Sequence, residues 1–508
     1  MNDVVAIADD LVRRGTRLAF GVTGSGASFD LIEALEERDV TYIPAGHEAA
    51  ATMMAGSATS VSGLPVPSVS IKGPGLANAV GGIAANHFEG HPSISLSEAY
   101  ENSAGSAHKR LDHRSLLTGI VKGHAGIRGG VVDELLELAS LEPPGPVHLD
   151  LASDAEIGSR QDKGSVVRGD LAGVLRRILD SQRPLLVVGS LAARRKWGTR
   201  LRGLRIPVFT TARAKGALDE TEPQAAGVLT GAGGPLSPEW ALAGQADLLV
   251  GIGLREGELI RDSSRPVETI LWDEIEDGLM RRPNVTCSYV DPSGKSVTEI
   301  LATLVDKEWG ETELGDVLRD IRARLTSGWG PGVCFEVIAP WSNFDSILDT
   351  GTFCTVAEHV YLATQVRRYA GTSNGRFMGT AIPFALGSAL ASGRPTICVL
   401  GDGGMRAYPG ELKIALAQDL PLLVILMTDG RYGSVATALG RPRSRSKALT
   451  TLLPSWDLAM EAMGFPTRTV ETADDFATAL NSWDRASPMF VEARFDSDGY
   501  ERITEGVR

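Results

Sequence analysis

Two apolar segments in the last third of the chain each end in an aspartate followed by glycine. PTICVLGDGG places Asp402 directly after one predicted buried strand, and LPLLVILMTDG places Asp429 after the next. The 25 residues between Gly403 and Asp429 are enough for one crossover, with Pro409–Ala417 as its helix. A helical crossover joins parallel strands, so we expect both carboxylates side by side at the carboxyl edge of one parallel sheet.

Two carboxylates at such an edge offer hard oxygen ligands. They suit Mg²⁺ or Ca²⁺, with the oxygens of a bound diphosphate completing the coordination. The alternative is that each Asp–Gly pair is only a tight turn, because both residues are common in turns. The spacing by one crossover, with an apolar strand before each aspartate, favours the metal site.

Short apolar runs, glycine turns and helical segments alternate along the whole chain. This alternation predicts an α/β fold of three tandem, doubly wound parallel-sheet domains. We expect the domains at residues 1–160, 166–325 and 330–500 of the 508, because single cores stop growing at roughly 250–300 residues. The polar segment Gly158–Ser165 and SGWGPG at 327–332 mark the boundaries. In the first domain we expect strands at Leu18–Phe20, Thr41–Ile43, Val66–Ile71 and Val147–Leu151, and helices at Asp30–Glu37 and His47–Ser57.

Charge and cysteine usage narrow the class of protein. A formal charge of −13 argues against nucleic acid or an anionic membrane as partner, since both bind basic faces. The longest apolar run, Leu420–Met427, is too short to cross a bilayer, and the N-terminus has no signal-peptide pattern. The four cysteines are scattered and form no CxxC pair, so we expect buried thiols in a reduced compartment. These features predict a cytoplasmic protein.

The two Asp–Gly corners resemble a motif of the thiamine-diphosphate enzyme family that includes acetolactate synthase, benzoylformate decarboxylase and pyruvate decarboxylase. In that family GDG is followed, at the same distance, by two asparagines, the second of which binds the metal. The resemblance implies thiamine diphosphate with Mg²⁺ (or Ca²⁺), held by the side chains of Asp402 and Asp429 and by the carbonyl of Arg431. Asp429 departs from the pattern, because it adds a negative charge where asparagine is usual. Further cofactor contacts are implied at Gly401, Gly403, Gly404, Gly430, Tyr432 and Gly433.

Glu48, in AGHEAAATMMAG, matches the catalytic glutamate of the family's first domain. The resemblance implies that its carboxylate hydrogen-bonds N1′ of the cofactor's aminopyrimidine and so promotes loss of the C2 proton of the thiazolium. The alternative is a solvated glutamate in the first turn of a helix, where the macrodipole favours negative charge. The catalytic role implies that Glu48 of one subunit faces Asp402 and Asp429 of another.

Further matches extend the resemblance across nearly the whole chain. FGVTGSG (20–26) is similar to the family's first strand-to-helix corner, which implies a cofactor contact at Gly24 and an active-site role for Ser25. IKGPGLANAVGGIAAN (71–86) resembles a segment that usually reads TSGPG…N, with Lys72 in place of serine, facing either substrate or solvent. RFMGTAIPFALGSALA (376–391) resembles the helix start that helps to hold the cofactor, which implies a contact from Met378.

The histidines leave the proton-transfer group open. The chain lacks the adjacent His–His pair of pyruvate-type decarboxylases. His91, in NHFEGHPS, falls near the place of the histidine in benzoylformate decarboxylase, and we expect it to exchange protons with the 2-oxo acid or its adduct. The alternative is a loop histidine bonded to the backbone. His108 and His113 are further choices, and Arg110 or Arg114 could pair with a substrate carboxylate.

The family also places a large apolar residue under the cofactor, which bends the cofactor into a V shape. DTGTFCTVAEH (349–359) is the segment that we align with this position, with Thr355 or Val356 as the support. Neither is the usual Met, Leu or Ile. The resemblance therefore implies an unusually small support.

The family resemblance implies a carbon–carbon lyase or carboligase that acts on a 2-oxo acid, with acetolactate-synthase-like decarboxylation and ligation to an aldehyde or ketone. The alternatives are a simple 2-oxo acid decarboxylase, an acyloin- or dione-cleaving lyase, and a non-catalytic relative that binds the cofactor. The stretch from RPLLVVGS to ADLLVGIG resembles the family's central domain but carries no flavin signature, so we do not expect FAD. We expect a homodimer or a homotetramer, since the family's active sites lie between subunits.

Overall fold

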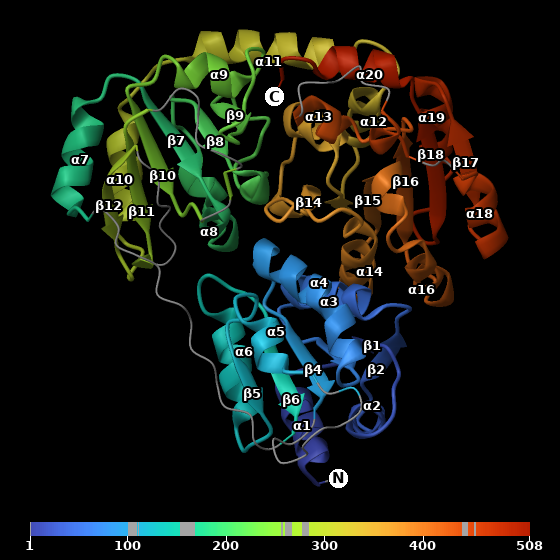
Figure 1. Cartoon of the computed structure of the whole chain (residues 1–508). Helices are drawn as coiled ribbons and strands as arrows, with labels where there is room; N and C mark the ends of the chain where they lie inside the picture. Colours follow the sequence, from blue (N-terminus) through green and yellow to red (C-terminus); the bar gives the residue numbers. More distant parts are fainter. Residues whose placement is uncertain are drawn as a thin grey trace.

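The computed structural model describes residues 2–99, 109, 111–152, 168–255, 258–259, 267–276, 284–438, 446–451 and 454–507. Within these residues, three six-stranded sheets follow one another along the chain, and all paired strands in the sheets run parallel. In Figure 1 they form three lobes, coloured blue, green and orange to red. The predicted α/β class is confirmed. The exact domain limits stay predictions, and the linker 158–165 lies outside the described residues.

The first sheet has the strand order β2-β1-β3-β4-β6-β5. Its inner strands β3, β4 and β6 are buried on both faces, as expected for a parallel sheet covered by helices. The four strands expected from the sequence are present, whereas β4 and β5 were not foreseen. The strands are β1 (Leu18–Gly21), β2 (Thr41–Pro44), β3 (Pro67–Ser70), β4 (Ile94–Glu98), β5 (His124–Gly126) and β6 (Val147–Leu151). The helices are α1 (Asn2–Arg13), α2 (Ala27–Glu36), α3 (Glu48–Ser62), α4 (Pro74–Glu89), α5 (His113–Leu117) and α6 (Val131–Ser140).

The central sheet has the order β9-β8-β7-β10-β11-β12, the arrangement of dinucleotide-binding α/β folds. Its strands are β7 (Pro184–Val188), β8 (Val208–Thr210), β9 (Ala225–Val228), β10 (Leu248–Ile252), β11 (Thr269–Asp273) and β12 (Val285–Val290). The helices are α7 (Leu171–Asp180), α8 (Ser190–Arg194), α9 (Pro238–Ala243), α10 (Val297–Val305) and α11 (Glu311–Leu325), with short 3₁₀ segments η2 (Trp197–Leu201) and η3 (Ala212–Ala214).

The third sheet, ordered β14-β13-β15-β16-β18-β17, repeats the strand order of the first. Its strands are β13 (Asp345–Leu348), β14 (Ala370–Gly371), β15 (Thr396–Gly401), β16 (Leu422–Thr428), β17 (Thr467–Val470) and β18 (Met489–Arg494). The helices are α12 (Pro331–Ile338), α13 (Thr352–Val360), α14 (Ala381–Ser392), α15 (Asp402–Met405), α16 (Lys413–Ala417), α17 (Gly433–Ala438), α18 (Trp456–Met463), α19 (Ala473–Asn481) and α20 (Ser497–Thr504), with η5 (Val366–Arg368), η6 (Pro409–Leu412) and η7 (Lys447–Leu449). The expected crossover helix at 409–417 is present as η6 followed by α16.

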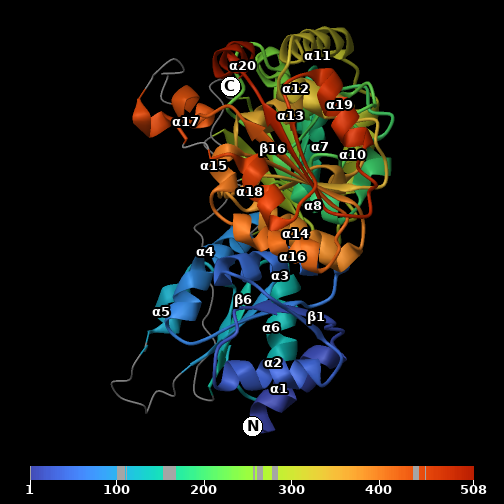
Figure 2. The same ribbon diagram turned by 90° about the vertical axis from the view of Figure 1, so that its right-hand side faces the viewer.

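Helices α3 and α14 join the first domain to the third (Figure 2). Both helices contribute to one apolar core, which includes Met54 and Phe384. They approach closely, because a Cβ on Gly387 would lie only 2.2 Å from the carbonyl oxygen of Met54. Ser57 Oγ also donates to the Phe384 carbonyl at 2.7 Å. Contact this close leaves the two helices no room to slide past each other.

Helix α11 spans the central and third domains across the top of Figure 1. Near its end, the Arg324 guanidinium donates to three backbone carbonyls of α20 and the residue after it. All four cysteines are buried thiols, as expected from the sequence. None of the helices among the described residues is both long and apolar enough to span a bilayer.

Candidate functional site

The two predicted metal-binding aspartates lie at the carboxyl ends of neighbouring strands. β15 and β16 pair in register from Thr396↔Leu422 to Gly401↔Met427, so the residues that follow both strands reach the same edge. Asp402 is 3% exposed, and its Oδ2 accepts hydrogen bonds from the Gly430 backbone N–H at 2.8 Å and from Thr451 Oγ1 at 2.8 Å. Asp402 therefore holds the loop that carries Asp429, and the expected juxtaposition is present.

The electrostatics of this edge favour a cation. Burial and then the negative charge of Asp402 raise the pKa of Asp429 to about 7. Burial also raises the pKa of Asp402, against the hydrogen bonds from Thr451 and Gly430. A divalent cation would stabilise both ionised carboxylates, and their oxygens are the ligands that Mg²⁺ and Ca²⁺ prefer. The donor set therefore fits the metal. The guanidinium of Arg431 pairs with Glu501 at 2.8 Å, and the role of its carbonyl stays a prediction.

Glycines beside these aspartates allow the chain to pack closely where side chains would not fit. A Cβ on Gly403 would lie 2.8 Å from the Tyr432 ring and 3.1 Å from Met378 Sδ. A Cβ on Gly404 would lie 2.0 Å from Asp349 Oδ2. Gly401 and Gly433 are partly exposed, and bare backbone of this kind can approach the phosphates of a ligand closely. We call these four glycines, together with the buried Gly430, the glycine-lined surface.

Asp349 belongs to this surface and was missed by the sequence reasoning. It follows β13 and is fully buried, and it accepts hydrogen bonds from the backbone N–H groups of Gly379 at 2.6 Å and Thr350 at 2.8 Å. Burial raises its pKa to about 7. It fixes the loop between Met378 and α14. The signal was present, because DSILDTG is a third apolar strand that ends in an aspartate.

Glu48 is the first residue of α3 and is only 9% exposed. Its Oε2 accepts a hydrogen bond from Asn78 Nδ2 at 3.1 Å. His47 caps the helix, with its Nδ1 accepting from the Ala49 N–H at 3.1 Å. A buried carboxylate held by an amide does not match the alternative of a solvated first-turn glutamate. Asn78 lies within the 71–86 segment, but its contact with Glu48 could not be read from the sequence.

The corner at 20–26 packs against the start of the 71–86 segment. A Cβ on Gly24 would lie 1.7 Å from Ile71 Cγ2, and the neighbouring Ser25 is exposed. Lys72 forms an ion pair with Glu98 at the end of β4. Both side chains are partly buried, so Lys72 is not a simple solvated lysine. The cofactor contact at Gly24 and the role of Ser25 stay predictions.

His91 lies away from this group of residues. It is 6% exposed, its Nδ1 lies 3.2 Å from Asn86 Oδ1, and its ring meets Phe384 edge-on at 4.9 Å. Burial, and then the charge of Arg213, lower its pKa well below the ordinary value. His91 lies past the end of α4 and turns back to Asn86, which is eight residues beyond Asn78, a rise of about 12 Å along the helix at 1.5 Å per residue. The structure does not bring His91 to Glu48, and its catalytic role remains a prediction without structural support.

The predicted supports of a bent cofactor, Thr355 and Val356, are both buried. Val356 is 0% exposed and Thr355 6%, because α13 packs into the core of the third domain. Their role as supports stays a prediction. Met378 is 47% exposed, with its sulfur beside Gly403. Met378 is therefore the large apolar side chain available at this surface.

The other residues considered for proton transfer or for pairing with a substrate carboxylate lie partly within and partly outside the described residues. His108 and Arg110 lie outside the described residues. Arg114 is exposed on α5, whereas His113 is 6% exposed and belongs to a second polar cluster in the first domain.

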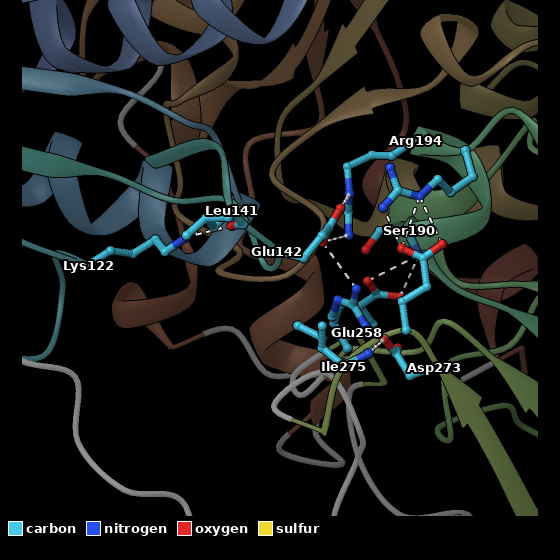
Figure 3. Close-up of polar contacts among 11 residues, drawn as sticks. Lys122, Leu141, Glu142, Ser190, Arg194, Glu258, Asp273 and Ile275 are labelled. Carbon is cyan, nitrogen blue, oxygen red and sulfur yellow. Dashed lines mark hydrogen bonds and ion pairs between the residues drawn. The ribbon is translucent and has the colours of Figure 1, made fainter. Parts of the chain in front are cut away.

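The carboxyl edge of the central sheet is filled by the chain's own side chains (Figure 3). Glu258 accepts hydrogen bonds from the Ser190 N–H at the start of α8, at 3.1 and 3.2 Å, and from Thr211 Oγ1 at 2.8 Å. A Cβ on Gly189 would lie 2.7 Å from Glu258 Oε2. In folds of this topology, dinucleotide phosphates bind at the equivalent helix start. Here a protein carboxylate takes that position.

A charged network next to Glu258 joins the central domain to the first (Figure 3). Glu142, which follows α6, accepts from Arg194 at 2.7 Å and from Arg255 at 3.1 Å. Arg255 also pairs with Asp273 at the end of β11. Burial raises the pKa of Asp273 to about 6, against the charge of Arg255. These contacts are structural and lie apart from the glycine-lined surface.

Family models of thiamine pyrophosphate enzymes match all three parts of the chain. The N-terminal thiamine-pyrophosphate-binding domain matches residues 1–116, the central domain residues 171–272 and the C-terminal thiamine-pyrophosphate-binding domain residues 349–493. The third match contains the glycine-lined surface with Asp402 and Asp429, and the first contains Glu48.

Relatives of known description resemble the chain over most of its length. The probable acetolactate synthase large subunit of Methanocaldococcus jannaschii is 25% identical over 86% of this chain and 81% of its own. The probable 2-ketoarginine decarboxylase of Pseudomonas aeruginosa is 23% identical over 84% and 81%. The solved thiamine diphosphate-dependent 4-hydroxybenzoylformate decarboxylase of Rhodococcus jostii covers 97% of this chain and 99% of its own, with a TM-score of 0.77 and 20% identity. That likeness bears on the fold alone.

Proposed function

The chain belongs to the thiamine pyrophosphate enzyme family, and on this premise we propose that it makes and breaks the carbon–carbon bond next to the carbonyl of a 2-oxo acid. One observation carries the proposal: the glycine-lined surface at the ends of β15 and β16 adjoins the buried Asp402 and the partly buried Asp429, two neighbouring carboxylates that a cation would stabilise. We propose that this surface binds thiamine diphosphate with Mg²⁺, or Ca²⁺ in its place.

Each part of the site has a distinct task in this proposal. Asp402, Asp429 and the Arg431 carbonyl hold the metal. The backbone at Gly401, Gly403, Gly404, Gly430 and Gly433, with the Tyr432 ring beside it, accepts the diphosphate. Met378 supports the bent cofactor in place of Thr355 or Val356. Thiamine diphosphate, when bound, supplies a nucleophilic carbon and an electron sink.

Glu48 is proposed to accept and return a proton at the aminopyrimidine, with its carboxylate oriented by Asn78. Glu48→Gln keeps the shape and the hydrogen-bonding capacity of the side chain but removes its basicity. We expect turnover to fall by at least about 100-fold, the usual contribution of a positioned acid or base, with cofactor binding retained. Glu134→Gln, on the exposed side of α6, is the matched control. Normal turnover by Glu48→Gln would refute the assignment.

The proposed reaction is decarboxylation of a 2-oxo acid followed by ligation to an aldehyde or ketone. The relatives named acetolactate synthase support this choice. The relative named 2-ketoarginine decarboxylase supports simple decarboxylation as the second candidate. Pyruvate and benzoylformate should be supplied with and without an acceptor aldehyde, and carbon dioxide and products measured. Acetaldehyde or benzaldehyde as the sole product would replace ligation by simple decarboxylation.

Two further alternatives are separated by the same measurements. An acyloin- or dione-cleaving lyase would consume such a compound without releasing carbon dioxide. A non-catalytic relative would bind thiamine diphosphate and Mg²⁺ in calorimetry but turn over none of these substrates. The buried Glu48 argues against the second alternative, because burying a carboxylate without a role is unfavourable.

The proposal includes no flavin. The Glu258 carboxylate at the start of α8 would repel the phosphates of FAD, and an absorption spectrum of the purified protein tests this. We further propose a homodimer or homotetramer in which Glu48 of one subunit faces the metal site of another. Light scattering measures the assembly. A cytoplasmic location is in keeping with four buried thiols, which suit a reducing compartment.

A further inference from the structure

Three histidines and one aspartate converge inside the first domain. His124 lies on β5, His148 and Asp150 lie on β6, and His113 begins α5. None of the four residues is more than 6% exposed. His113 Nδ1 lies 2.6 Å and His148 Nε2 3.2 Å from Asp150 Oδ1, and His124 Nε2 lies 2.6 Å from Asp150 Oδ2. No step of the proposed reaction uses this cluster.

The atoms are spaced as ligands of one ion would be. His113, His148 and Asp150 each present a ligand atom, and these atoms lie within 4.8 Å of one another. His124 turns its Nε2 to Asp150, so its Nδ1 points away from these three ligand atoms.

Outer contacts hold two of these ligands in place. Ser95 on β4 places its Oγ 2.8 Å from His148 Nδ1, so His148 Nε2 is directed into the cluster. His124 bonds the second oxygen of Asp150 and leaves Oδ1 for an ion. Metal-binding histidines and carboxylates are typically oriented by outer partners of this kind.

We propose that His113, His148 and Asp150 bind one Zn²⁺ ion, with Ser95 and His124 as outer partners. Imidazole nitrogen with carboxylate oxygen suits zinc, whereas the all-oxygen set at Asp402 and Asp429 suits Mg²⁺. The chain would then carry two cation sites of different chemistry in two domains.

The zinc ion would have a structural role near the start of α4, the helix that carries Asn78. Gly73, just before α4, lies beside His113, with its backbone nitrogen 3.5 Å from His113 Nε2. Asn78 on the same helix is the hydrogen-bond partner of Glu48. An ion that ties α5 to β6 would steady this wall of the first domain, so the effect of zinc should appear in stability.

The test uses the full chain, stripped with a chelator and titrated with Zn²⁺ by calorimetry in the presence of excess Mg²⁺. We expect one zinc per chain, confirmed by elemental analysis, and a rise in the thermal midpoint. His113→Gln and His148→Gln should each lose this zinc. Ser95→Ala should weaken its binding about 10- to 100-fold, as loss of an outer partner does.

Two controls locate the ion. His87→Gln removes an exposed histidine of α4 and should leave zinc binding unchanged. Asp402→Asn removes a ligand of the Mg²⁺ site and should also leave it unchanged. The proposal is overturned if the wild type takes up no zinc, or if His113→Gln, His148→Gln and Ser95→Ala all bind zinc as the wild type does. If the histidine variants fail to fold by circular dichroism, the affinity of folded Ser95→Ala alone decides.

Discussion

Thr451→Val tests whether Asp402 is held as a metal ligand by its neighbours. Thr451 is 4% exposed, and its Oγ1 donates to Asp402 Oδ2 at 2.8 Å. Valine keeps the shape of threonine but cannot donate. A hydrogen bond to a charged group contributes about 1.5–3 kcal/mol, and every 1.4 kcal/mol is a factor of ten in affinity. The Gly430 N–H still donates to the same oxygen, so we expect Mg²⁺ affinity to fall by about 10- to 100-fold rather than vanish.

The assay is a Mg²⁺ titration of the stripped protein at saturating thiamine diphosphate, followed by activity and by calorimetry. Thr450→Val is the matched control, because it makes the same chemical change at the adjacent exposed position. Turnover at saturating Mg²⁺ should recover in Thr451→Val, since the ligand remains and only its preorganisation is lost. Affinity for Mg²⁺ within twofold of the wild type would refute the role of Thr451, and with it the assignment of Asp402.

Other predictions address the cofactor support, the domain joint and the response to acid. Met378→Ala should leave the thermal midpoint nearly unchanged, because the side chain is 47% exposed. The same variant should bind thiamine diphosphate more weakly in calorimetry, and unchanged affinity would show that Met378 is not part of the site. Phe384→Ala should lower the free energy of unfolding by about 3–5 kcal/mol in urea, since it empties the core between α3 and α14; a loss below about 1 kcal/mol would mean that this core is loosely packed. Burial lowers the pKa of His148 in the folded protein. The contribution of its neutral form to the free energy of unfolding is therefore present above pH 6.5 and is lost as the pH falls toward 4. With a chelator present, this loss should reach on the order of 3 kcal/mol in urea unfolding, and a flat profile would contradict it.

The sequence predicted the parts of the molecule that depend on local pattern. Apolar runs that end in glycine located β1, β15 and β16, and the spacing of Asp402 and Asp429 predicted their meeting. β5 escaped notice because it is three residues long and begins with His124, so it has no apolar run. The burial of Glu48 did not follow from its place in the first turn of a helix, where the same residue type is often solvated.

What could not be predicted depends on contacts between distant segments. Thr451 bonds Asp402 across 49 positions, and Asn78 bonds Glu48 across 30. The position of His91 relative to Glu48 could not be predicted for the same reason, because it depends on the length and direction of α4. Met378 was recognised as a contact, but only its exposure separates it from the buried Thr355 as the support.

The shared strand order of the first and third sheets gives the chain an internal pseudo-twofold symmetry. In each, the helix between the second and third strands of the domain is the one that crosses the joint: α3 in the first and α14 in the third. In a symmetric dimer, an isologous contact is one in which the same surface of each subunit meets its copy. The contact between α3 and α14 is of this kind, but it joins two domains of one polypeptide. The positions that begin these helices are therefore counterparts, with Glu48 on one and the Met378–Thr380 loop on the other. The two domains share a scaffold but carry different functional groups at equivalent positions. We therefore expect that a glutamate moved from the start of α3 to the start of α14 would not replace Glu48.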